Sequence, residues 1–255
     1  MKNIYEENMK FWELFSKSLD IFTNNFKNIL LITLLIYIPI DVLLFYVWEY
    51  FLNSSNITFE GFSNYTRIAW WLESLFWVIT SIFVILLVKN SLDSKETDFK
   101  ELFKLSITKW PKVVWANILY SIAVWFWILL LIVPWIYLSV IWVFFLYAIV
   151  LNDKSVWESF TYSKKIVNWR WWEIFGYWFF SFMLVILFWL AMWFMPYLET
   201  IYMDVFTSLL IDIVALFTVV LFTLKFINID KNYKDEVIEK AEEKESIEKV
   251  EKNEL

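Results

Sequence analysis

Long apolar runs separated by polar segments dominate the hydrophobic pattern of this chain. Each run approaches the roughly 20 residues with which an α-helix crosses a hydrocarbon layer about 30 Å thick. The pattern predicts six membrane spans, at 27–51, 69–89, 113–133, 136–151, 172–195 and 204–228. The fourth run is short, so we expect Pro134 and Trp135 to lie near the membrane surface. The predicted fold class is all-α, a polytopic membrane helix bundle of residues 1–228.

Lysine and arginine gather in alternate connections between these spans. They are frequent in 1–27, 89–112, 152–171 and the tail, whereas the three other connections hold only Arg67. Loops rich in positive charge stay on the cytoplasmic side. We therefore expect both termini to be cytoplasmic, and the charged tail, 229–255, to be a frayed helix or disordered.

Three polar segments on that side look alike. Phe11–Phe26, Phe99–Trp110 and Val156–Trp169 each place apolar residues at helical spacing opposite Lys, Ser or Asn, and each leads into a span. The pattern predicts three units, each an interfacial amphipathic helix followed by a membrane hairpin. Amphipathic connections also occur in proteins without repeats, so that alternative stays open. We expect the lysines to contact anionic headgroups of membrane lipids and no nucleic acid.

The chain contains neither cysteine nor histidine. Disulfides, thiolate nucleophiles and the commonest metal ligand and general base are therefore missing. We expect no enzyme activity, no cofactor and no metal.

Tryptophan is in large excess, and glycine is almost absent, with 18 Trp and 2 Gly in 255 residues. A typical protein is about 7% glycine, or roughly 18 residues in a chain of this length. Membrane helices use glycine more than soluble helices do. Reassignment of the UGA codon to glycine, with that codon read here as tryptophan, would explain both counts. The alternative, a tryptophan-rich membrane protein, explains only the first.

Several tryptophans occupy positions that suit glycine. Trp135 follows Pro134 where a tight turn needs a positive φ, and Asn168-Trp169 and Trp110-Pro111 stand where glycine commonly ends a helix or marks a turn. Two others are spaced like the glycines of a helix-contact face. The tryptophans that we expect to be glycine under this reassignment are Trp110, Trp125, Trp127, Trp135, Trp157, Trp169, Trp189 and Trp193. As literal tryptophans, these side chains should crowd helix contacts and tight turns.

With glycine at five of these positions, residues 123–176 resemble a known family. The features that carry the resemblance are a turn before a tyrosine, an amphipathic helix with Glu-Ser and Ser, and an Arg-Trp-Trp start to the next span, at Pro134, Tyr137, Glu158, Ser159, Ser163, Arg170, Trp171 and Trp172. Together with LFSKSLDIFTNNFKNILLITLLIYIP near the N-terminus, they resemble bacterial multi-pass proteins grouped with the membrane domain of glycerophosphoryl diester phosphodiesterases. The resemblance implies a bacterial cytoplasmic (inner) membrane and carries no catalytic activity over, because these residues contain no counterpart of the catalytic domain.

Two carboxylates fall inside predicted spans, Asp41 after Pro39 and Asp212 in the sixth span. Ionisable groups are costly in lipid, so both are candidates for function, and a pair facing one cavity could carry protons or cations. In the structural alternative, Asp41 bonds backbone groups freed by Pro39 and Asp212 faces a polar seam. The acidic residues expected at span ends are Glu49, Glu73, Glu199 and Asp204.

The sequence favours a non-catalytic integral membrane protein in membrane organisation or lipid handling. The main alternative is a small-solute or ion transporter or permease subunit that uses Asp41 and Asp212. A third class is an assembly factor that binds a protein partner through the acidic tail.

The recoding hypothesis predicts the codons of the gene. We expect TGA at most of positions 110, 125, 127, 135, 157, 169, 189 and 193, and TGG at 171 and 172. Sequencing the gene measures this directly. TGG at every tryptophan position would show that the residues are tryptophans.

Overall fold

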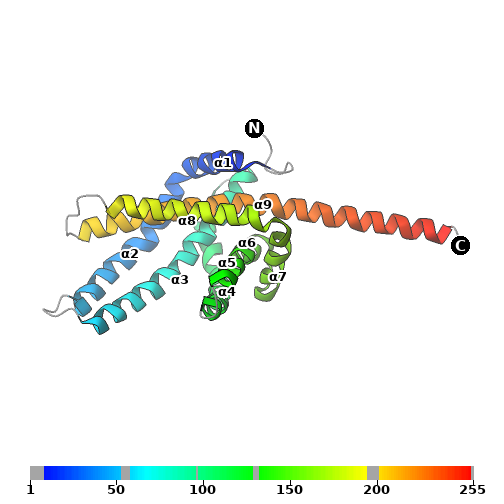
Figure 1. Cartoon of the computed structure of the whole chain (residues 1–255). Helices are drawn as coiled ribbons and strands as arrows, with labels where there is room; N and C mark the ends of the chain where they lie inside the picture. The colour runs from blue at the N-terminus through cyan, green and yellow to red at the C-terminus, as the bar shows by residue number, and fades with distance from the viewer. Residues whose placement is uncertain (1–8, 53–57, 96, 129–131, 194–200, 254–255) are drawn as a thin grey trace.

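The fold is that of a computed structural model, which describes residues 9–52, 58–95, 97–128, 132–193 and 201–253 (Figure 1). All regular structure within these ranges is helical, which confirms the all-α fold class. The elements are α1 (Phe11–Asn24), α2 (Phe26–Leu52), α3 (Phe59–Leu92), α4 (Phe99–Ile128), α5 (Ile132–Ile141), α6 (Phe145–Asn152), α7 (Val156–Val167), η1 (Asn168–Arg170), α8 (Trp171–Trp193) and α9 (Ile201–Asn253).

Five helical segments of the described residues are long and apolar enough to cross a membrane. They are Phe26–Phe51, Phe59–Leu92, Pro134–Asn152, Val156–Ala191 and Phe206–Asp235. The chain is therefore a multi-pass membrane protein. The expected span 113–133 is not among the five, and residues 129–131 lie outside the described part. The layout of six spans in three hairpins stays a prediction.

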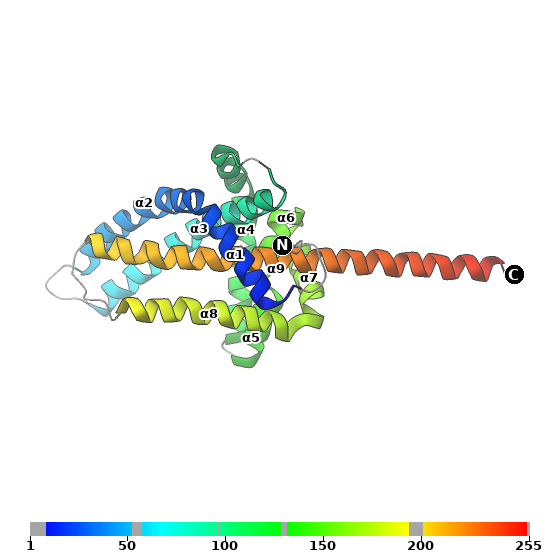
Figure 2. The same ribbon diagram turned by 90° about the horizontal axis from the view of Figure 1, so that it is seen from above.

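Helix α9 is the centre of the bundle and contacts α1, α2, α3 and α8. Of these helices, α8 and α9 run side by side along one long axis, α2 and α3 are inclined to it, and α9 continues beyond the bundle (Figure 1). Seen from above, α4 and α5 run across this axis rather than along it (Figure 2). Helix α4 contacts both α3 and α5, so α4 and α5 lie on the side of the bundle next to α3.

The amphipathic helix α1 packs directly on α9. Its buried face contains Leu14, Ser18 and Phe22, and the Phe22 ring lies 5.6 Å from the Phe217 ring of α9. The helix ends at Asn25, whose side-chain amide donates to the Ser91 hydroxyl of α3 at 3.0 Å. Apolar residues at helical spacing therefore bury one face of α1, as the sequence predicts.

The Ser163 side chain bonds backbone groups at the break between α5 and α6. The helical path is interrupted at 142–144. The Ser163 hydroxyl of α7 donates to the Ile141 carbonyl at 2.7 Å and accepts from the Phe144 amide at 3.2 Å. Backbone groups buried away from water need such partners. Ser163, which belongs to the family-like motif, thus holds α7 against α5 and α6, the two parts of the interrupted span.

Two further motif residues, Glu158 and Ser159, lie in the first turn of α7. The Ser155 hydroxyl accepts from the Glu158 amide, and the Ser155 amide donates to the Glu158 carboxylate at 2.9 Å. This reciprocal arrangement is a capping box, which satisfies amide donors at a helix N-terminus. Ser159 lies on the buried face with Ser163.

Packing continues past residue 228, where the membrane domain was expected to end. The Asp230 carboxylate accepts hydrogen bonds from Asn152 at 2.8 Å, from Lys234 at 2.6 Å and from the Tyr162 hydroxyl. These contacts join α6, α7 and α9. The rest of the tail is helical in α9 up to Asn253.

The expected turn geometry is wrong at three tryptophans. Among the described residues, the non-glycine residues with positive φ are Ser94 and Asp153. Trp135 lies inside α5, Trp110 and Pro111 lie inside the continuous α4, and Trp169 lies in η1. Pro134 is tolerated because the amides of the first helical turn have no intrahelical partner.

The expected crowding is also wrong at three of these positions. Trp157, Trp169 and Trp189 are 73%, 93% and 48% exposed, so they do not wedge helices apart. Trp110 is half-buried and donates to the Leu75 carbonyl at 2.8 Å. The side chains of Trp125, Trp127 and Trp193 lie outside the described part. Recoding of tryptophan positions stays a prediction, because it concerns codons.

We expect Ser163→Ala to lower the free energy of unfolding by about 1–3 kcal/mol, because two buried backbone groups lose their partner. Thermal unfolding in detergent, followed by circular dichroism, measures the change. Thr161→Ala is the matched control on α7, since the Thr161 hydroxyl donates to the exposed Trp157 carbonyl and bonds no buried backbone group among the described residues. Equal effects of the two substitutions would contradict this role of Ser163.

Candidate functional site: an acidic cavity in the helix bundle

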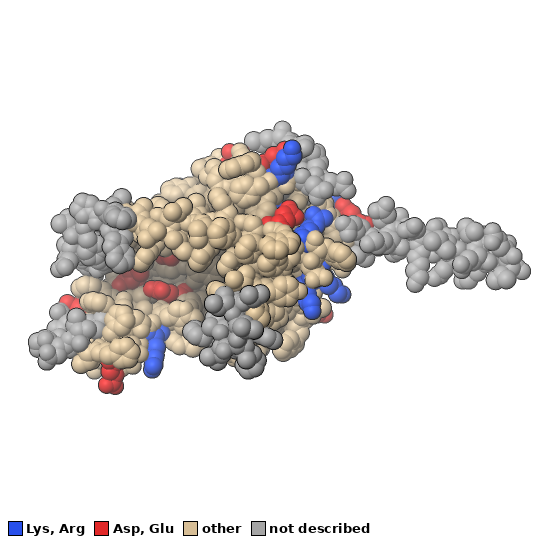
Figure 3. Space-filling model, in the orientation of Figure 1, with Lys and Arg blue, Asp and Glu red and all other residues tan. Residues whose placement is uncertain are grey.

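A cavity of about 1190 Å³ lies among α2, α3, α4, α8 and α9. Its lining residues are Tyr37, Trp70, Trp71, Glu73, Ser74, Leu75, Trp77, Val78, Val114, Asn117, Ile118, Tyr120, Ser121, Ile122, Trp189, Ser208, Ile211 and Asp212. Most of this wall is aromatic or aliphatic, with two carboxylates and a few neutral polar groups. Figure 3 shows acidic side chains inside a hollow between the upper and lower parts of the bundle.

Three carboxylates from three helices converge at this cavity. Asp212 of α9 and Glu73 of α3 line it. Asp41 of α2 lies beside it and accepts a hydrogen bond at 3.5 Å from Ser208, which is a lining residue. Each of the three is close enough to interact electrostatically with another member of the group. The structure thus brings together the two aspartates singled out in the sequence.

Glu73 is a member of this group that the sequence analysis missed. It was expected at a span end, but α3 begins at Phe59 instead of near 69, so Glu73 lies near the middle of the helix. The early turns of α3 contain Glu60 and Arg67, which hide the span from hydropathy. A signal was available in the helical spacing, because Trp70, Glu73 and Trp77 recur at three and four residues and share one face.

The carboxylates of Asp41 and Asp212 have unused hydrogen-bonding capacity. In each, the Oδ2 atom is buried and has no partner among the described residues. The partner of Asp41 is Ser208, not backbone around Pro39. None of the three carboxylates is paired with a described lysine or arginine. A buried polar group without a partner is costly, so these two oxygens are suited to accept a hydrogen bond or to bind a proton or a cation.

A second charged site in the bundle is fully paired, and this contrast is informative. Lys225 of α9 is only 1% exposed and forms an ion pair with Glu173 of α8. Its ammonium lies 5.0 Å from the centre of the Tyr177 ring. Charges buried in proteins are normally compensated in this way. Lys225 and Glu173 therefore compensate each other in helix packing, whereas the carboxylates of the acidic cavity have no such cation among the described residues.

At the other end of α3, a small ion cluster marks the helix terminus. Lys89 and Lys95 lie 3.0 and 3.5 Å from the carboxylate oxygens of Asp93. Partial burial would raise the pKa of Asp93, but the hydrogen bond and charge of Lys89 and the charge of Lys95 together lower it below its ordinary value. This cluster lies at a solvent-exposed helix end, whereas the acidic cavity lies among five helices.

The aromatic motif residues pack between α5 and α8. The Tyr137 ring stacks on Trp171 at 6.0 Å, and Trp171 stacks on Phe175 at 5.1 Å. Trp172 is 78% exposed instead. These residues position the start of α8 and lie away from the acidic cavity.

Comparison with known protein families, curated proteins and solved structures finds no match. The resemblance to the membrane domain of glycerophosphoryl diester phosphodiesterases therefore stays a prediction. Function has to be argued from the geometry of the chain itself.

Proposed function

We propose that the protein binds an amphipathic organic cation in the acidic cavity and acts as a small-solute transporter or permease subunit. The observation that carries the proposal is the convergence of Asp41, Glu73 and Asp212 on one cavity without a cationic partner. Like charges held together in a membrane bundle repel each other and are poorly solvated. A bound cation removes both penalties.

The cavity wall defines the class of cation. Trp70, Trp71 and Tyr37 line the cavity. Aromatic rings attract a positive charge, and this attraction strengthens when water is excluded. The apolar area around them suits an aliphatic or aromatic body. Among the described residues, no group of three or more acidic side chains is close enough to hold a metal ion. An organic cation with an apolar body therefore fits better than a bare metal ion.

Protons compete with this cation. Each carboxylate that takes up a proton loses its attraction for the ligand, so cation release and proton uptake are coupled at the same groups. Such coupling is the basis on which intramembrane acidic residues serve transport. A transporter role follows from this exchange, and it needs no catalytic group.

The surface helices favour a second role, in membrane organisation or lipid handling. On α1, Trp12 and Leu19 are exposed although Leu14 and Phe22 are buried. A helix with apolar residues on its outer side suits the interface of a bilayer. We propose that α1 and α7 contact anionic headgroups at the cytoplasmic face of a bacterial inner membrane, with both chain termini on that side and no enzyme activity.

Binding of tetraphenylphosphonium tests the cation site. We expect the purified protein in neutral detergent to bind it, and Asp212→Asn or Glu73→Gln to weaken binding about tenfold, because each removes a nearby charge from a medium of reduced dielectric constant. Isothermal titration calorimetry measures the affinity. Flux of the same cation into proteoliposomes should fall in parallel.

Glu60→Gln is the matched control, since it makes the same change on α3 outside the cavity. It should bind like the unmodified protein. The unmodified protein and the three variants should unfold at similar temperatures, which would show that weaker binding does not result from unfolding. Unchanged affinity in the cavity variants, or no binding at all, would refute the proposal and leave membrane organisation as the better account.

A further inference from the structure

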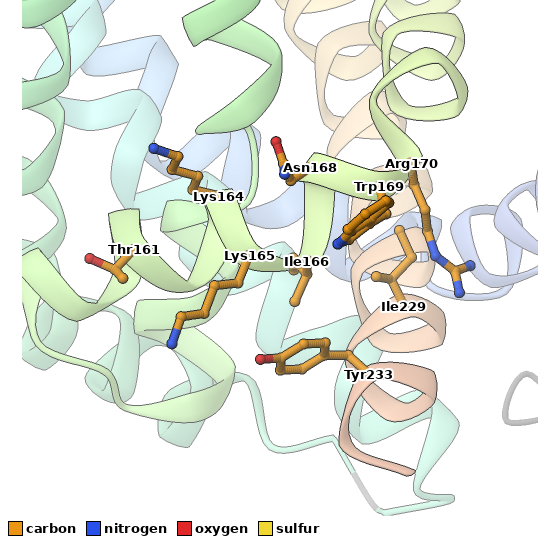
Figure 4. A pocket seen from close by; sticks show the side chains of 9 residues that line it. All are labelled: Thr161, Lys164, Lys165, Ile166, Asn168, Trp169, Arg170, Ile229 and Tyr233. Atoms are coloured by element: carbon orange, nitrogen blue, oxygen red, sulfur yellow. The ribbon is translucent and has the colours of Figure 1, made fainter. Parts of the chain in front are cut away.

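A second pocket, distinct from the acidic cavity, lies where α7, η1 and α9 meet (Figure 4). It has a volume of about 680 Å³. Its lining residues are Thr161, Lys164, Lys165, Ile166, Asn168, Trp169, Arg170, Ile229 and Tyr233. Three of these are cationic and none is acidic. Side chains of α7, η1 and α9 thus line one space, with Ile166 and Ile229 as its apolar part.

The folded core fixes the orientation of these donors. Ser163 and Ile166 are buried on one face of α7, and Ser163 bonds the broken span. The neighbouring Lys164 and Lys165 are therefore turned outward, and both are exposed. In Figure 4, the hydroxyl of Tyr233 points toward the side of the pocket on which Lys165 extends.

Two acidic groups on the helices around this pocket are engaged elsewhere. Glu173 pairs with the buried Lys225. Asp230 accepts from Asn152 and Tyr162 and pairs with Lys234. The charges of Lys164 and Lys165 are thus available to attract an anion from outside the protein.

The pocket lies at the level where a membrane-crossing helix begins. Its residues Asn168 and Arg170 directly precede α8, whose apolar run starts at Trp171. Trp172 in the first turn is exposed, and tryptophan is enriched at the membrane–water interface. Lysine and arginine also gather at this end of the bundle (Figure 3).

We infer that this pocket is a binding site for the phosphate of an anionic phospholipid headgroup. Lys164 and Lys165 supply the charge, and Asn168 and Tyr233 supply neutral hydrogen-bond donors. The acyl chains would follow the outer face of α8, where Phe179, Phe182 and Leu187 are exposed. A lipid fits better than a soluble phosphate, because the same surface offers both the donors and an adjoining apolar path.

This site is separate from the proposed cation site. Asp212 and Tyr233 are both on α9 and lie about 30 Å apart at a rise of 1.5 Å per residue. Each site can therefore fail its test without affecting the other. If both exist, the lipid site fixes the cytoplasmic end of the bundle in the membrane.

Fluorescence anisotropy of a phosphatidylglycerol labelled on its acyl chain tests the inference on the full chain in neutral detergent. We expect Lys164→Gln/Lys165→Gln to weaken binding about tenfold or more, since each basic residue near an anionic lipid surface contributes substantially to attraction. Lys100→Gln/Lys104→Gln is the matched control. It removes the same charge from exposed positions of α4, outside the pocket.

The control pair should bind like the unmodified protein, and Lys164→Arg/Lys165→Arg should retain binding. Unlabelled phosphatidylglycerol should displace the probe, whereas phosphatidylcholine and inorganic phosphate should not. An equal loss of affinity in both glutamine pairs would show that general surface charge attracts the lipid, and would overturn the inference. Displacement by inorganic phosphate as effective as by phosphatidylglycerol would assign the pocket to a soluble anion, which also overturns it. Tetraphenylphosphonium binding should be unchanged in both pairs.

Discussion

The cost of placing a charge in a hydrocarbon layer governs the interior of this protein. A charged side chain in a membrane bundle must be paired, hydrogen-bonded or exposed to a water-filled space. Lys225 meets the requirement with Glu173 and the Tyr177 ring. The group formed by Asp41, Glu73 and Asp212 meets it only in part, since two of its carboxylate oxygens have no partner among the described residues. The same constraint thus distinguishes a packing contact from the proposed binding site.

Backbone groups obey a related constraint, and it explains how the surface helices are placed. A break in a helix exposes amides and carbonyls that lipid cannot satisfy. Ser163 satisfies those at the break between α5 and α6, and so fixes α7 against the bundle. Asp230 then fixes α9 against α6 and α7. Lys164 and Lys165 acquire their outward orientation from these contacts. The basic pocket therefore depends on polar contacts elsewhere in the bundle.

The sequence predicted the parts of this arrangement that follow from local patterns. Helical spacing predicted α1 and α7, and the rarity of intramembrane charges singled out Asp41 and Asp212. Glu73 was missed because the end of a span was judged from hydropathy, while α3 extends through polar turns. The tryptophan turns were wrong because sequence neighbours such as Pro134 and Trp135 suit either a turn or the first turn of a helix. The cavity itself depends on five helices meeting, which no local pattern contains.

The central claim is that the three carboxylates face a hydrated cavity that favours cations, and cysteine accessibility tests it most directly. The chain has no cysteine, so a single cysteine can replace Ser121 or Ser208 in the wall, with Leu187 on the exposed face of α8 as the control position. In reconstituted vesicles, the rate of reaction with a trimethylammonium methanethiosulfonate is compared with that of its sulfonate counterpart. The account predicts that cysteines in the cavity wall react, and react about tenfold faster with the cationic reagent, because acidic walls concentrate cations. No reaction at either wall position, or faster reaction with the anionic reagent, would contradict it.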